Sequence, residues 1–402
     1  MRLVFLVALV AATRHETLLR ERNSTVSAGG RRLVWVGADK VGLGNVLAGF
    51  PDLYFRALRE GATIVVGESH AITRDLVRFF DVGFASERST CEPSMRASPA
   101  STCAKTYLSY KGLGAADVAR LFGANATAYC RPGPMLARRP LTRAAASPDE
   151  ARARGAETYE RYEGFSFWPN RTLPCGLQYG LRALIRGPGA GLARALPELE
   201  ALWDGDASRL AGLVSRAPGD FVYAVAVHVR TLLPHFERTQ CHRSGCGGLR
   251  ENETAAETRR WLDRPAVRGR WREIADDVEA LCGGRAPCPV FVASELALVR
   301  ADLAAVLRGR AALDVDFLRA PSVGHVEAAG RRLAVDPGAT AAERASPYLD
   351  WYALANARDI VVRRGHDNLE PKASTYSTTA RAWGLDIDRS LRRGVPPCDG
   401  LA

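Results

Sequence analysis

The chain has 402 residues and is 47% hydrophobic, which is enough for two domains with ordinary cores. Its formal net charge is +11, and nearly all of the positive charge comes from arginines scattered along the sequence. Because no basic block is interleaved with aromatic residues, we expect no nucleic-acid partner, although an anionic substrate or membrane surface would be attracted.

The first twelve residues are typical of a signal peptide or a short signal anchor. Met1 and Arg2 precede an apolar run from Leu3 to Ala12, and this run is much shorter than the roughly 20 residues that span a bilayer. A buried N-terminal strand is the alternative interpretation. Residues 13–30 are polar and end in two glycines, so we expect them to form a stem before the first domain.

Sequons and cysteines favour the secretory pathway. N-glycosylation sequons begin at Asn23, Asn125, Asn170 and Asn252. The nine cysteines suit an oxidising compartment. The candidate disulfide pairs are Cys91/Cys103, Cys130/Cys175, Cys241/Cys246 and Cys282/Cys288. We therefore expect the protein in the lumen of the endoplasmic reticulum or Golgi, or secreted.

The first half of the chain alternates apolar runs with helical stretches. We expect strands at residues 31–37, 62–67 and 79–85, a helix over 46–60, loops or insertions at 87–106 and 131–157, and helical structure over 176–213 that breaks at 187–189. This strand–helix–strand order predicts a parallel sheet with right-handed crossovers.

The second half is more regular. Strands are expected at 221–229, 289–293, 311–317 and 359–362, and helices at 270–281, 296–308, 346–356 and from 377. Such alternation is typical of a doubly wound sheet. The sequence thus predicts two α/β domains, residues 31–215 and 216–402, joined near residue 215.

One strand of the second half ends in two residues that suit a ligand site. The run Tyr223-Ala-Val-Ala-Val-His-Val-Arg230 is apolar until His228 and Arg230, and ligands of parallel sheets bind outside the carboxyl ends of the strands. The planar guanidinium of Arg230 matches a phosphate and stays charged. The alternative is an arginine that pairs with a surface carboxylate.

Two further segments suit anion binding. Gly42-Leu-Gly-Asn45 falls between a predicted strand and a helix, where glycines let the backbone approach a ligand, although a plain tight turn explains it equally well. Ser374-Thr-Tyr-Ser377 opens the last predicted helix, so its hydroxyls and amides could cradle a phosphate. An ordinary helix cap is the alternative there.

Other motifs are absent or weak. The D-x-D triplets at Asp204, Asp314 and Asp386 compete with one another, and the alternation around Asp314 is that of an amphipathic strand, so no metal ligand is assigned. The chain contains neither G-x-x-x-x-G-K-[ST] nor G-x-S-x-G, which argues against a P-loop enzyme and an α/β-hydrolase.

Taken in order, the motifs resemble those of the GDP-fucose-dependent fucosyltransferase superfamily, which has the GT-B fold. The resemblance covers about residues 31–390 and is thin over 87–215. It rests on the G-x-G-N loop, His228-Val-Arg230, the strand end at Ser294-Glu295, and Ser374-Thr-Tyr-Ser377. It implies an α/β architecture of two Rossmann-like domains that face a cleft.

The resemblance also implies roles for the matching residues. Arg230 would bind the β-phosphate of GDP and stabilise the leaving group, while His228 would approach the guanine. Asp350 would contact the base or ribose. The diphosphate would be held by Ser374, Thr375 and Ser377, and Gly42, Gly44 and Asn45 would close over it from the N-terminal domain.

The implied reaction is inverting, metal-independent transfer of fucose from GDP-fucose to a hydroxyl of a glycan or glycoprotein, without a cofactor. Glu237, with His235 as the other candidate, would be the general base that follows Arg230. The chain departs from relatives at Thr231, Glu295 and Tyr376, where some have Arg, Asp and Phe, so its subfamily stays open. Alternatives are a catalytically silent lumenal binding protein of the same fold and a GT-B enzyme that uses another nucleotide sugar.

Overall fold

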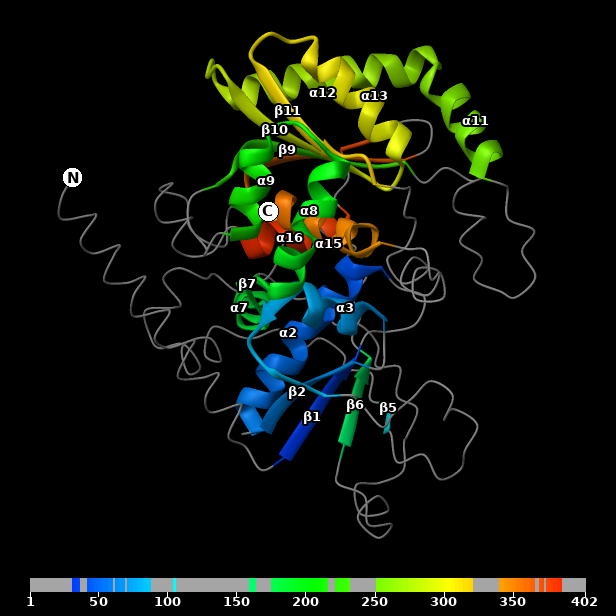
Figure 1. Cartoon of the computed structure of the whole chain (residues 1–402). Helices are drawn as coiled ribbons and strands as arrows, with labels where there is room; N and C mark the ends of the chain where they lie inside the picture. The colour runs from blue at the N-terminus through cyan, green and yellow to red at the C-terminus, as the bar shows by residue number, and fades with distance from the viewer. Residues whose placement is uncertain are drawn as a thin grey trace, which may run out of the picture. The chain divides into compact units, whose positions relative to one another are not determined.

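The protein is an α/β chain that divides into two compact units, each built on its own sheet (Figure 1). The first unit comprises Met1–Gly187 and Leu385–Ala402, and the second comprises Pro188–Gly384. The computed structural model describes residues 31–36, 42–60, 62–68, 71–87, 104–105, 159–163, 175–215, 221–231, 251–320, 340–365, 369–371 and 374–384.

The first unit contains a parallel sheet with the strand order β4-β2-β1-β6-β5. Its strands are β1 (Arg31–Val36), β2 (Ala62–Gly67), β4 (Ala85–Glu87), β5 (Ala104–Lys105) and β6 (Tyr159–Glu163). Helix α2 (Leu43–Glu60) packs on this sheet, and its Phe50 contacts Trp35 of β1 edge to face, with 4.9 Å between ring centroids. The aromatic contact fixes the first helix against the first strand.

The strand expected at residues 79–85 is two strands in different sheets. Helix α3 (Ala71–Phe79) leads directly into β3 (Phe80–Val82), which pairs with β7 (Ile185–Pro188). After Gly83 the chain enters β4 and joins the main sheet. The preceding helix α7 (Cys175–Leu184) packs on α2, and a side chain at Gly180 would lie 2.7 Å from Pro51, so only glycine fits this contact.

The second unit has the sheet order β12-β9-β10-β11-β8. Its strands are β8 (Trp203–Asp204), β9 (Tyr223–Arg230), β10 (Cys288–Ser294), β11 (Leu313–Leu318) and β12 (Ala357–Arg364). All pairs are parallel except β8 with β11. The chain moves outward from β9 through β10 to β11, then returns to place β12 on the other side of β9. The order in which strands are added therefore reverses between β9 and β12, and doubly wound sheets bind ligands at such a point.

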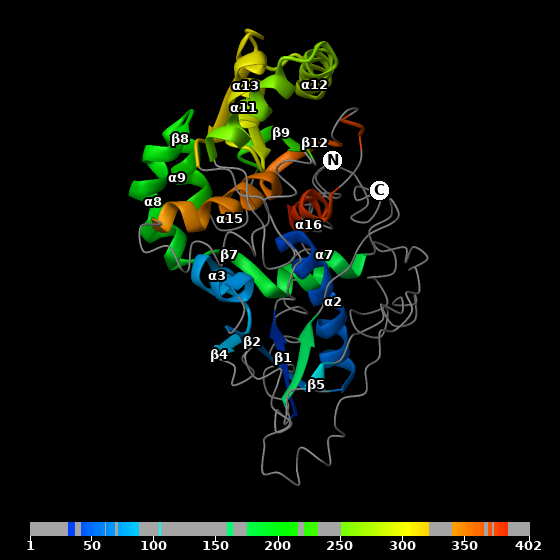
Figure 2. The ribbon, with the colours of Figure 1, turned by 90° about the vertical axis from the view of Figure 1, so that its right-hand side faces the viewer.

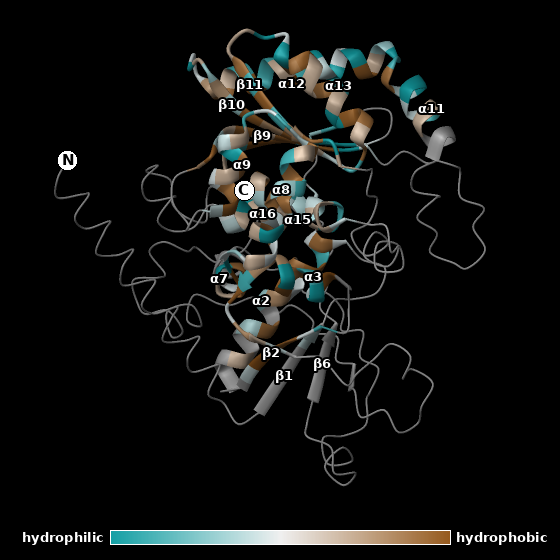
Figure 3. Ribbon diagram, viewed as in Figure 1, coloured by the Kyte–Doolittle hydropathy of each residue, from teal (hydrophilic) through white to brown (hydrophobic). Residues whose placement is uncertain are grey.

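Helices cover both faces of this sheet (Figures 1 and 2). One face carries α11 (Glu251–Leu262), α12 (Pro265–Cys282) and α13 (Ala297–Arg308), and the other carries α8 (Ala190–Leu202), α9 (Ala207–Ser215), α15 (Ala341–Ala355) and α16 (Thr375–Gly384). The strands between them are strongly apolar (Figure 3). All residues of β9 except Arg230 are buried, as expected of a central parallel strand.

The second unit begins at Pro188 rather than near residue 215. The reason is that β8 pairs with β11, and Glu198 of α8 accepts a 3.1 Å hydrogen bond from the amide of Ala342 at the start of α15. The sequence pattern showed the helices before residue 215 but not the short antiparallel edge strand that ties them to the second sheet.

Several helix starts also differ from the sequence-based prediction. Helix α11 lies between the expected strand at 221–229 and the expected helix at 270–281, where no helix was predicted. Helix α12 begins at Pro265, because proline is tolerated in a first turn. Helix α15 begins at Ala341, not near Ser346, because Thr340 and Glu343 form a capping box. The side chain of Thr340 accepts from the Glu343 amide at 3.1 Å, and Glu343 accepts from the Thr340 amide at 2.9 Å.

Of the predicted disulfides, Cys282–Cys288 is confirmed and joins the end of α12 to the start of β10. Several predicted features lie outside the described residues. They are the partners proposed for the other cysteines, the N-terminal segment, the stem, and the candidate bases Glu237 and His235. No helix in the described ranges is long and apolar enough to cross a membrane.

Candidate functional site

The candidate site lies at the carboxyl ends of β9, β10 and β12. Strand register places Arg230 opposite Arg364 of β12, and Val229 opposite Ser294 of β10. The amide of Gly365 donates to the Arg230 carbonyl at 3.0 Å and ties two of these strand ends together. Arg230 thus stands at the reversal point of the sheet, beside residues from both neighbouring strands.

His228 is buried and is connected to the start of the last helix. Its Nδ1 lies 3.3 Å from the hydroxyl of Ser374, and its ring packs on Tyr376 with 5.3 Å between centroids. Burial lowers the pKa of His228 to about 4, with Arg230 and Arg364 acting in the same direction and Glu295 against it. The imidazole is therefore neutral at pH 7 and offers one donor and one acceptor.

Ser374 caps α16 and also contacts the site. Its hydroxyl accepts from the Ser377 amide at 3.2 Å and lies 3.1 Å from the Ser377 hydroxyl, while its carbonyl accepts the first helical hydrogen bond from Thr378. The two interpretations of this segment are therefore compatible: Ser374 can cap the helix and also line a ligand site. Thr375 is the first helical residue, and first-turn amides have no partner within their own helix.

The carboxylate that lies at ion-pair distance from Arg230 is buried and not on the surface. Nη1 of Arg230 lies 3.7 Å from Oε1 of Glu295, whose side chain is 4% exposed. The same oxygen accepts from the amide and the hydroxyl of Thr231, at 2.7 and 2.6 Å. Because these two hydrogen bonds fix the carboxylate, Glu295 holds the end of β9 and faces Arg230 at ion-pair distance.

Asp350 is linked to the residues around His228 indirectly, through Tyr376. One of its carboxylate oxygens accepts from Nη1 of Arg300 at 3.2 Å, and the other is buried with no hydrogen-bond partner among the described residues. Burial raises the pKa of Asp350 to about 7, although Arg300 opposes this shift. Asp350 also acts electrostatically on Tyr376, which packs on His228 and donates its hydroxyl to the Pro347 carbonyl.

The G-x-G-N segment is not a loop. Helix α2 begins at Leu43, so Gly44 and Asn45 lie in its first turn, and the carbonyl of Gly42 accepts from the Asn45 and Val46 amides at 3.0 and 3.1 Å. These residues belong to the first unit, whereas Arg230 belongs to the second. The side-chain oxygen of Asn45 is buried and has no hydrogen-bond partner within the described part of the chain.

The triplets that begin at Asp204 and Asp314 lie side by side, and their carboxylates pair with arginines. Arg209 donates to Asp316 at 2.6 and 2.7 Å and to Asp314 at 2.7 Å, and Asp316 also accepts from the Asp206 amide and the Tyr223 hydroxyl. Asp204 pairs with Arg308 and Arg319. No metal-binding group of three or more side chains occurs in the described ranges, and Asp386 lies outside them.

The sequence analysis named Thr231 and Glu295 but gave neither of them a role beside Arg230. Thr231 and Glu295 each come directly after a strand and are both buried. The signal was available, because a buried polar residue at a parallel strand end needs a partner at the neighbouring strand end. Arg300 gave no such signal, since its partner lies 50 residues further along the chain.

Comparison with solved structures finds similar fucosyltransferases. The NodZ α-1,6-fucosyltransferase co-crystallised with GDP matches 87% of this chain and 92% of that chain, with 13% identity and a TM-score of 0.38. The fucosyltransferase NodZ from Bradyrhizobium matches with 12% identity and a TM-score of 0.37 over the same shares. No family model and no curated protein matches the chain. At these identities and TM-scores the superposition assigns neither a fold nor an activity. The functional proposal therefore rests on the residues of the site.

Proposed function

We propose that the protein is an inverting, metal-independent glycosyltransferase that moves fucose from GDP-fucose to a hydroxyl of a glycan or glycoprotein. The observation that carries the proposal is the convergence of Arg230, the neutral His228 and the hydroxyl-rich start of α16 at the reversal point of a parallel sheet. In the proposed GT-B arrangement, the second unit binds the donor and the first unit binds the acceptor.

The donor site suits a nucleotide with two phosphates. Arg230 supplies a fixed positive charge, since Glu295 and Thr231 hold the end of its strand. A neutral His228 can exchange hydrogen bonds with a base without a charge penalty. In this proposal, His228 approaches the guanine and Asp350 contributes to the base or ribose site, while Arg230 binds the β-phosphate.

Charge stabilisation by protein groups can replace a metal in this reaction. As the bond to fucose breaks, negative charge grows on the diphosphate, and preorganised donors stabilise such charge most effectively in a partly buried site. In this proposal, Arg230 and the first-turn amides of α16 stabilise that charge, which their positions at the end of β9 and the start of the last helix support. The carboxylates of the described D-x-D triplets are engaged by Arg209, Arg308 and Arg319.

The proposal includes Glu237 as the general base and the secretory pathway as the cellular location. Glu237 would accept the proton of the acceptor hydroxyl, so Glu237→Gln should reduce transfer without reducing GDP affinity. The sequons and the Cys282–Cys288 disulfide support a lumenal or secreted protein. The N-terminal apolar segment would direct this entry.

Nucleotide binding tests the donor assignment. GDP should raise the Tm of the protein and UDP should not, because a ligand that binds only the folded state stabilises it. Arg230→Lys keeps the charge but loses the planar fork, so it should weaken GDP binding. A response to UDP alone would overturn the fucose assignment, and GDP binding without any donor turnover would support a silent binding protein instead.

A further inference from the structure

The end of β12 places a second arginine beside Arg230. Arg364 is the register partner of Arg230, and directly paired residues of parallel strands project to the same face of a sheet. His228 projects to this face as well, two residues before Arg230, and it contacts Ser374 at the start of α16. Arg363 projects to the opposite face and pairs with Asp277 of α12, as the alternation requires.

The backbone of Arg364 is fixed from two sides. Its amide donates to the Glu370 carbonyl at 2.9 Å, and the following amide, of Gly365, donates to the Arg230 carbonyl at 3.0 Å. Gly365 has φ +141°, a conformation that strongly favours glycine. The strand ends that carry the two arginines are therefore held together by the main chain.

The guanidinium of Arg364 is exposed, and no carboxylate pairs with it among the residues that the structure describes. It nevertheless belongs electrostatically to the site, because Arg230 and Arg364 both lower the pKa of the buried His228. Glu295 offsets part of the charge of Arg230, whereas no described carboxylate pairs with Arg364. The cluster therefore keeps a net positive charge, which favours an anionic group such as a phosphate.

Thr231 cannot supply this second charge. It is fully buried, and its amide and hydroxyl are both bound to Glu295. A longer cationic side chain at this position would remove the hydroxyl hydrogen bond to Glu295 and would have no room in this buried place. The neighbouring strand is therefore the source of the second cation in this protein.

We propose that Arg364 is a second phosphate-binding residue, and that Arg230 and Arg364 together bind the diphosphate of the nucleotide donor. This inference rests on the proposed nucleotide-sugar function. It identifies a binding residue on β12 that neither the strand motif nor the helix motif includes.

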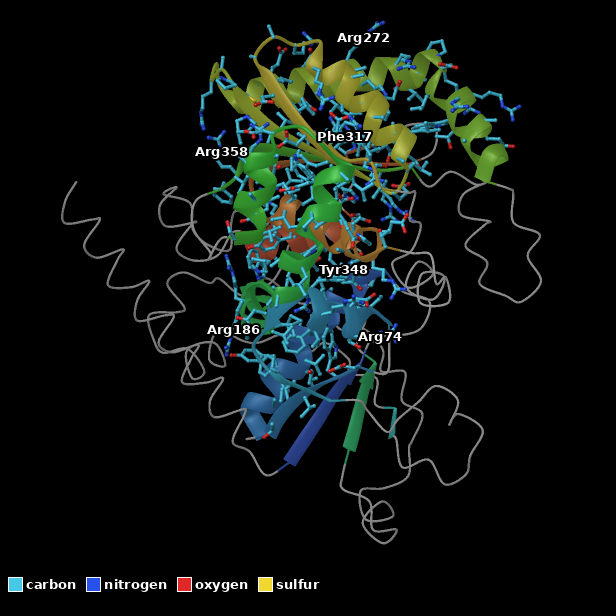
Figure 4. All side chains as sticks on the ribbon, viewed as in Figure 1. Arg74, Arg186, Arg272, Phe317, Tyr348 and Arg358 are labelled. Carbon is cyan, nitrogen blue, oxygen red and sulfur yellow. A yellow bond between two sulfur atoms is a disulfide. The ribbon has the colours of Figure 1, made fainter. Side chains whose placement is uncertain are left out.

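Calorimetry with GDP and with guanosine tests the assignment on the full chain. Arg364→Gln should raise the Kd for GDP by about 10- to 100-fold, as expected for a lost charge-assisted contact, and should leave the Kd for guanosine unchanged. Arg364→Lys should fall between wild type and Arg364→Gln. The control is Arg272→Gln, which removes the same charge from an exposed position on α12, on the other face of the sheet (Figure 4).

The outcomes separate the inference from the proposed function. If wild type does not bind GDP, the proposed function fails. If wild type binds GDP and Arg364→Gln binds it as tightly as Arg272→Gln does, the proposed function stands and the role of Arg364 is overturned. An equal loss of guanosine and GDP affinity would also overturn it, because Arg364 would then act on the nucleoside and not on the phosphates.

Discussion

His228 and Asp350 are buried titratable side chains whose pKa values shift in opposite directions. Burial lowers the pKa of His228 to about 4 from an ordinary value of 6.5, and it raises that of Asp350 to about 7 from 3.8. Both shifts favour the neutral form. His228 is therefore neutral at pH 7, and Asp350 keeps its proton well above the usual pH range of a carboxyl. Both shifts should appear in the pH dependence of stability.

The stability difference between wild type and His228→Gln should grow as pH rises from about 4 to 6.5. In this window the unfolded histidine binds a proton that the folded histidine does not, so folding is favoured at higher pH. The slope can reach about 1.4 kcal/mol per pH unit. Urea unfolding of both proteins at several pH values measures it, and a difference that does not change with pH would show that His228 titrates normally.

Asp350→Asn should give the opposite sign. Between pH 3.8 and about 7 the folded Asp350 keeps a proton that the unfolded one has lost, so its contribution to stability falls as pH rises through this window. The difference between wild type and Asp350→Asn should therefore shrink toward pH 7, in the same urea experiments. A difference that stays constant over this window would mean that Arg300 keeps Asp350 ionised.

At the scale of elements, the capping box of α15 sets where that helix begins and thereby the position of Asp350. Thr340→Ala removes the cap of the Glu343 amide and should lower the free energy of unfolding by about 1 kcal/mol. Ser215→Ala is the control, since this exposed hydroxyl donates to the Ala211 carbonyl of its own helix and to no other group among the described residues. An equal, small effect of both changes in chemical unfolding would refute the role of the cap.

The sequence predicted the parallel strands of the second sheet well, because continuous apolar runs such as Tyr223 to Val227 have few alternatives. It predicted helix starts less well, since Thr340 and Glu343 act through hydrogen bonds that an apolar pattern does not contain. Gly42 to Asn45 was assigned to a loop because glycines favour turns, but Leu43 is buried and begins the helix. The motifs predicted the residues that meet around His228. They did not predict Arg300 or Arg364, because the neighbours of these two arginines in the fold are distant in the sequence.

At the scale of the whole molecule, a buried charge network ties residues 203–209 to the second sheet. Asp316 is fully buried and depends on Arg209, while Trp203 of β8 stacks on Phe291 of β10 with 5.8 Å between centroids. This network explains why the second unit begins at Pro188. It also means that the two acidic triplets within the described residues form ion pairs that hold β8 and α9 on the second sheet.

Arg209→Met should lower the free energy of unfolding by about 3–5 kcal/mol, because it leaves the buried charge of Asp316 without its cation. Adding Asp316→Asn should recover part of this loss. The control is Arg310→Met, whose surface pairs with Asp276 and Glu279 are worth about 0–1 kcal/mol. Urea unfolding compares the three variants, and similar losses for Arg209 and Arg310 would contradict the structural role of the network.

Transfer of labelled fucose from GDP-fucose to a glycan array, measured in the presence of EDTA, tests the central claim most directly. We expect transfer by wild type in EDTA, and a fall of about 100- to 1,000-fold for Arg230→Lys, the size typical of a lost transition-state donor. Transfer from a UDP-sugar only, loss of wild-type activity in EDTA, or an unchanged rate for Arg230→Lys would contradict the account.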